Sequence, residues 1–135
     1  MPLLTKFYCF PKDLAEKKHN LATDTITLAF TSVPPSLSDT VIADITQISY
    51  TNFVSSRNLT ITTTSVNGIY TVTAANLNIS VTANSPFFTH LVVYNNTAPT
   101  GPLIGYYDLQ ATAYISTSSP FTAGFSQFDP LLIIS

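Results

Sequence analysis

The sequence predicts an all-β fold, an antiparallel β-sandwich or jelly roll of about eight strands with one short N-terminal helix. The 135-residue chain contains 21 threonines, and β-branched side chains suit a pleated, half-exposed sheet surface. Short segments in which apolar and polar residues alternate are separated by turn residues at regular spacing. We expect a single domain over 1–135, in which 1–21 form an arm with the helix and 22–135 form the sandwich.

The expected helix begins at Pro11, because proline fits the first helical position, where its missing N–H costs nothing. Asp13 and Glu16 precede Lys17, so acidic and basic side chains lie at the favourable ends of the helix dipole. Asp13 and Lys17 also form an i,i+4 pair. A helix of roughly ten residues is marginal in isolation, so we expect it to dock on another surface.

Phe7, Phe10 and Leu14 form an apolar stripe along this segment, although Phe7 precedes the proline. One interpretation is that these three candidate interface residues dock the helix across a subunit or capsid boundary. The other is that the helix caps the open end of its own sandwich. Cys9 is expected to be a small buried apolar side chain beside the two phenylalanines.

The strands after residue 21 begin with 25–30, where Ile26, Leu28 and Phe30 are expected to face inward. Two prolines end this strand at 34–35. The segment 38–48 fits either a helical turn or a strand, and we favour a short extended piece with a turn.

The Asn67-Gly68 dipeptide predicts a β-hairpin between 59–66 and 69–75, because it favours turns with two positive φ angles. Segment 77–84 alternates cleanly, and 87–94 is apolar on both faces, which indicates a central strand. The remaining predicted strands span 103–109, 112–117 and 121–128.

Charge is scarce: 9% of the residues are charged, and no charged residue lies between Arg57 and Asp108. Five basic residues are too few for a nucleic-acid footprint. Neither a signal peptide nor a membrane-spanning apolar run is visible in the sequence. A neutral surface of Thr, Ser and Asn is instead expected to face another protein subunit, since buried charges cost desolvation energy.

No sequence motif for catalysis, a cofactor or a metal is present, so we expect no enzyme activity, no cofactor and no metal. Asp108 and Asp129 could act as a carboxylate pair in glycoside chemistry, but a strand end and an Asp-Pro turn explain them better. His19 and His90 lack the further ligands that zinc requires, and His90 is expected to be a hydrogen-bonded core or interface residue.

Three segments carry a resemblance to a family of small virion proteins of tailed bacteriophages: "KFYCFPKDLAEKKHNLATDTITLAFTSVPP", "VIADITQISY" and "LVVYNNTAPTGPLIGYYDL". The resemblance covers most of the chain, and the central hairpin matches least. Where a glycine-rich link is expected after the Ala-Asp-Ile segment, this sequence has "SYTNFVSSRN". The resemblance implies a structural component of the particle on the capsid exterior, without catalytic residues.

Two functions from different classes follow. The first is a capsid decoration or cement protein, assembled in the host cytoplasm, which contacts the major capsid protein and itself, with a trimer as the expected form. The second is a tail-fibre or spike module that binds host surface glycans. In that case Tyr106 and Tyr107 are expected to form an exposed aromatic platform beside Asp108.

Overall fold

The computed structural model describes residues 4–124 and 130–134, and it confirms the mostly β architecture with one short N-terminal helix. A four-stranded antiparallel sheet has the order β1–β7–β6–β2. Its strands are β1 (Thr5–Lys6), β7 (Leu103–Ala113), β6 (Phe88–Asn95) and β2 (Ile26–Thr31). A three-stranded sheet has the order β3–β4–β9, and β5 pairs with β8. These strands are β3 (Ile61–Val66), β4 (Ile69–Ala74), β9 (Leu132–Ile134), β5 (Leu77–Ile79) and β8 (Phe121–Ala123).

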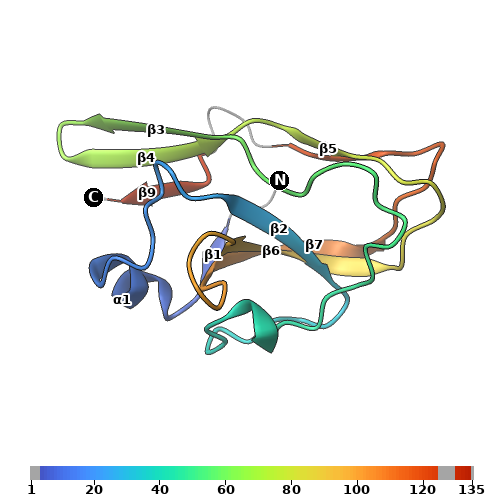
Figure 1. Ribbon diagram of the computed structural model, residues 1–135, viewed down its shortest axis with the longest axis horizontal. Helices are drawn as coiled ribbons and strands as arrows, with labels where there is room; N and C mark the ends of the chain where they lie inside the picture. Colours follow the sequence, from blue (N-terminus) through green and yellow to red (C-terminus); the bar gives the residue numbers. More distant parts are fainter. Residues whose placement is uncertain (1–3, 125–129, 135) are drawn as a thin grey trace.

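The two smaller sheets lie in one layer and the four-stranded sheet lies in the other (Figure 1). The main core fills the space between them, because buried side chains from both layers belong to one cluster, among them Leu28, Leu91, Val72, Ile79 and Leu132. The arrangement is therefore sandwich-like, as the alternating segments predict.

The predicted hairpin is confirmed in detail. Asn67 and Gly68 have φ angles of 52° and 79°, and the strands they join pair in uninterrupted register from Val66↔Ile69 to Ile61↔Ala74. Two positive φ angles match the turn to the right-handed twist of the strands. Figure 1 shows this turn at the left-hand extreme of the molecule.

The prediction that 87–94 forms a central strand is also confirmed, since β6 pairs with both β2 and β7. The inward-facing residues Ile26, Leu28 and Phe30 belong to the main core. All six residues of β2 are nevertheless buried, because a second cluster covers the other face of this sheet. That cluster consists of Phe7, Ala29, Ile45, Val92, Tyr94 and Leu103.

The short extended piece with a turn that we favour for 38–48 is confirmed: Val41 bridges to Pro102, and Ile42–Asp44 form a 3₁₀ turn. Asp44 accepts bonds from the N–H groups of Thr40 and Val41. Two other local expectations need correction. The strands expected over 103–109 and 112–117 are replaced by one long strand, β7, which ends at Ala113, so that 114–117 lie outside it. The helix α1 (Phe10–Ala15) has only six residues; the part of the last expected strand that falls on 125–128 lies outside the described residues.

The helix ends early because Lys17 adopts a left-handed backbone with φ 65°. The N–H of Lys18 then bonds back to the carbonyl of Asp13 at 2.9 Å, the six-residue closure typical of helix ends. This turn also changes the expected ion pair: Lys18 Nζ, not Lys17, lies 3.3 Å from the Asp13 carboxylate.

The two turn glycines Gly68 and Gly101 allow a matched prediction. Both have positive φ, so alanine strains the backbone at either position by about 1 kcal/mol. A Cβ at Gly68 meets no atom within 4 Å, whereas one at Gly101 would lie 2.6 Å from Ile42 Cγ2. We therefore expect Gly101→Ala to lower the free energy of unfolding by about 2 kcal/mol more than Gly68→Ala, as measured by urea titration. Equal losses would contradict the packing around Gly101.

Candidate interaction surface

The β3–β4–β9 sheet has one face on the core and one face directed away from it. The strand register places Val72 and Leu132 on the inner face, where both are buried. The opposite face, which we call the threonine face, is formed by Thr62, Thr64, Val66, Ile69, Thr71, Thr73 and Ile133. Every residue of this face is neutral, and four of the seven are threonines.

The threonine face combines hydroxyl groups with exposed apolar side chains. Val66 is 63% exposed and Ile133 is 51% exposed, and cross-strand pairing sets Thr62 beside Thr73 and Thr64 beside Thr71. A surface of this kind can pack against another protein without removing any charge from water. It therefore has the properties of a protein-contact surface.

Phe7 and Phe10, two of the residues expected at an interface, are only 1% and 2% exposed. Phe7 belongs to the second cluster, with its ring centroid 5.3 Å from that of Tyr106. Phe10 belongs to the main core. Both rings are buried inside the chain, which corrects the expectation that they anchor a partner. The structure supports the other interpretation, in which the helix covers its own sandwich.

Leu14, the third residue of the apolar stripe, is half-buried at the surface. It lines a pocket of about 510 Å³ with Tyr70 and Ile134, and a smaller pocket of about 250 Å³ with Pro11 and Ile133. Leu14 and Ile134 therefore border both pockets between the helix and β9.

Tyr106 and Tyr107 do not form the aromatic platform expected for sugar binding. Tyr107 is buried, which raises the pKa of its phenol. Tyr106 is half-buried between the rings of Phe7 and His90. Asp108 is exposed, and its carboxylate lies 3.7 Å from His90 Nε2.

An exposed aromatic pair occurs elsewhere, at Phe87 and Tyr114. These side chains are 62% and 51% exposed, and their ring centroids lie 5.4 Å apart in an edge-to-face arrangement. The sequence analysis missed this pair because the two residues are far apart in the chain. Only the strand pairing around Phe88 and Ala113 brings them together.

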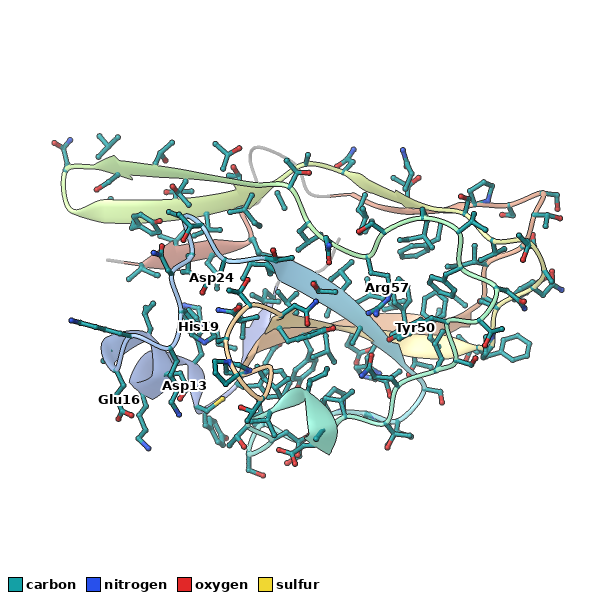
Figure 2. All side chains as sticks on the ribbon, in the orientation of Figure 1. Asp13, Glu16, His19, Asp24, Tyr50 and Arg57 are labelled. Atoms are coloured by element: carbon teal, nitrogen blue, oxygen red, sulfur yellow. The ribbon has the colours of Figure 1, made fainter. Side chains whose placement is uncertain are left out.

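A buried polar cluster joins the segment after the helix to the end of β6. Asn95 is fully buried, and its Nδ2 donates to the Asp24 carboxylate at 2.6 Å and to His19 Nδ1 at 3.1 Å. Its Oδ1 accepts from the N–H groups of Thr97 and Ala98. Figure 2 shows His19 and Asp24 on the same side of the molecule, above Asp13. Nearly every polar atom here is paired within the chain, so the cluster fixes the arm in place.

His19 is the exception within this cluster. Since Nδ1 accepts a bond from Asn95, the neutral ring carries its proton on Nε2, and Nε2 is buried without a hydrogen-bond partner. Burial lowers the pKa of His19, although Asp13 and Asp24 oppose the shift. The folded chain therefore favours a neutral His19.

Within 4–124 and 130–134, no group of three His, Cys, Asp or Glu side chains could hold a metal ion. Asp129, the expected partner of Asp108 in a carboxylate pair, lies outside the described residues. None of the helices in that part of the chain is long and apolar enough to span a membrane.

Comparison of the chain with family models, curated proteins and solved structures finds no match.

The buried position of Phe10 predicts a large loss of stability on truncation. We expect Phe10→Ala to lower the free energy of unfolding by about 3–5 kcal/mol, because it leaves a cavity in the main core. Leu14→Ala, a change in the same helix at a half-buried position, should cost about 1 kcal/mol. Urea titration of both variants measures the difference, and near-equal values would show that Phe10 does not belong to the core.

The lowered pKa of His19 predicts acid sensitivity. The unfolded chain binds a proton at His19 more readily than the folded chain does. The stability contributed by neutral His19 is therefore fully present above the ordinary histidine pKa of about 6.5. It is lost as the pH falls through the lower pKa of the folded state. Urea titrations at several pH values should show that His19→Gln loses less stability over this interval than the natural chain. The same pH dependence in both chains would contradict the assignment.

Proposed function

We propose that this chain is a structural protein of a tailed-bacteriophage virion, a decoration or cement protein on the capsid surface. The observation that carries the proposal is the threonine face, a neutral, partly apolar sheet surface at the exposed side of a sandwich-like domain. In this proposal the face contacts the major capsid protein. The sequence resemblance to small virion proteins supports the same assignment.

The distribution of charge favours a contact role for this face. The charge-free span between Arg57 and Asp108 contains both strands of the hairpin. Lys12, Glu16 and Lys17 lie instead on the exposed side of the N-terminal arm. A small domain needs some charged surface to be well solvated. A sheet surface without charge is expected where a neighbouring subunit covers it.

The Phe87–Tyr114 pair favours a second candidate function, the binding of host surface glycans by a tail-fibre or spike module. Exposed aromatic rings can stack on sugar faces. No acidic side chain lies within three residues of either ring in the sequence, so this pair lacks the neighbouring carboxylate expected beside Tyr106 and Tyr107. We rank this function second for that reason.

Copy number separates the two functions. Gel densitometry of purified virions of the phage that encodes this chain should find it in amounts comparable to the major capsid protein. A fibre or spike module would be present in few copies and should bind at least one sugar on a glycan array. Absence of the chain from purified virions would overturn both functions.

A pair of variants tests the contact surface itself. T71K/T73K places two lysines in the centre of the threonine face, and we expect it to weaken co-sedimentation with capsids by at least about tenfold, because the charges become desolvated on contact. T117K/S118K, with the same change in charge at an exposed turn, is the control and should bind normally. Equal binding by both variants would show that capsids contact another surface.

A further inference from the structure

The four-stranded sheet and the β3–β4–β9 sheet differ at their outer edges, β2 and β3. The outer edge of β2 is closed by the loop that follows it: Leu28 N donates to Arg57 O, and Arg57 Nη1 donates to Leu28 O. Phe30 N donates to the Tyr50 hydroxyl at 2.9 Å, and the Arg57 guanidinium lies 3.7 Å from the centre of the Tyr50 ring. Figure 2 shows Arg57 and Tyr50 side by side next to β2. No strand can therefore add to this edge.

In the described part of the chain, no strand pairs with the outer edge of β3. In a two-residue hairpin the residues that flank the turn form a hydrogen-bonded pair, and such pairs alternate along the strands. Val66, Thr64 and Thr62 therefore bond to β4, in agreement with the next pair beyond them, where Ala75 N donates to Thr60 O. The backbone N–H and C=O groups of the three residues between them, Ile61, Thr63 and Ser65, point away from β4. No hydrogen bond from another described residue meets them.

The residues of β3 themselves carry no feature that protects this edge from another strand. Proteins usually protect open edges with a lysine, a proline or a bulge. The segment Ile61–Val66 has no charge and no proline, and its register with β4 is unbroken. Among the described strands, the other free edges on β1, β5, β8 and β9 are only two or three residues long. The free edge of β7 beyond its pairing with β1 carries the charged Asp108, and its backbone is irregular at Gln110, where φ is 57°.

We propose that the outer edge of β3 pairs antiparallel with β3 of a second copy of this chain, about a two-fold axis at Thr63. This register uses every outward-facing residue: Thr63 pairs with Thr63 of the second copy, and Ile61 pairs with Ser65 of the second copy. Each such pair exchanges two backbone hydrogen bonds. The two hairpin sheets then form one continuous sheet across the dimer.

A second copy fits this edge because the edge is self-complementary. Two-fold pairing brings like strands together, so a charged edge would repel itself. Here Thr62 lies directly opposite Thr64 of the second copy, in a close pair where hydroxyl and methyl groups meet. This pairing rests on the proposed function and names a second copy of the chain as the partner. Two-fold pairing gives a closed dimer, whereas the sequence analysis expected a trimer, as in decoration proteins.

The contact is small beside the roughly 1,600 Å² of a standard interface. We therefore expect a dimer that dissociates at micromolar concentration, and repeated contacts in a shell would strengthen it by avidity. The test needs only the purified chain. If the chain does not dimerise, the virion proposal is still tested separately by its copy number in purified virions.

Sedimentation equilibrium of the purified full chain over a range of micromolar concentrations tests the pairing. The natural chain should change from monomer to dimer mass. T62K/T64K sets each lysine against a lysine of the second copy and should raise the Kd by about tenfold or more. T62K/T64E sets each lysine against a glutamate and should restore the dimer. These positions are exposed, so the fold should tolerate both variants, which circular dichroism would verify.

T71K/T73K is the matched control for position, because β4 lies one strand away from the proposed axis, and it should dimerise normally. A natural chain that stays monomeric, or that forms a trimer, would overturn the inference. So would a dimer whose Kd is the same in T62K/T64K. A dimer that T62K/T64E fails to restore would overturn the register centred on Thr63.

Discussion

The requirement to pair backbone polar groups at sheet edges governs the organisation of this protein. Buried N–H and C=O groups that lack partners cost free energy comparable to a lost hydrogen bond. The four-stranded sheet has a core cluster on each face, and all six residues of β2 are buried, so the β2 edge has to be closed. Arg57 closes it, although it is the sole cation after Lys18. The one arginine of the chain thus completes the edge of the four-stranded sheet.

The N-terminal arm belongs to the same core. Phe7 packs in the cluster on one face of the four-stranded sheet, while Phe10 packs in the main core on the other. The bonds of Asn95 to Asp24 and His19 hold the chain where it passes from the helix to β2. A short helix that is unstable alone is thereby stabilised by its tertiary contacts, and its removal would expose both core clusters.

The β3–β4–β9 sheet differs from the four-stranded sheet in its burial, its charge and its edge. It has one solvated face and no charge, and no other described strand pairs with its β3 edge. The single chain exposes this surface to water, and in the proposed assembly a neighbouring subunit covers it. Low charge, exposed apolar tips and an unpaired edge are the features of a contact surface, and they occur together on this sheet.

The sequence by itself determined the local structure wherever backbone chemistry is decisive. Asn67-Gly68 specified the hairpin because few other residues adopt two positive φ angles in succession, and the apolar run at 87–94 specified the central strand. The composition also indicated a neutral sheet surface. Site residues were harder to assign. The sequence predicts an apolar stripe of Phe7, Phe10 and Leu14, but such a stripe shows only that this side of the segment is buried, and does not show against which surface.

Tertiary structure decided what covers each surface. The burial of Phe7 and Phe10 within the chain, the meeting of Phe87 with Tyr114, and the bond of Arg57 to β2 all join residues from separate elements. Periodicity reports the preferences of one segment at a time, so it cannot show which segment provides the partner. The open edge of β3 follows from the same fact, because an edge strand and a central strand differ only in their neighbours.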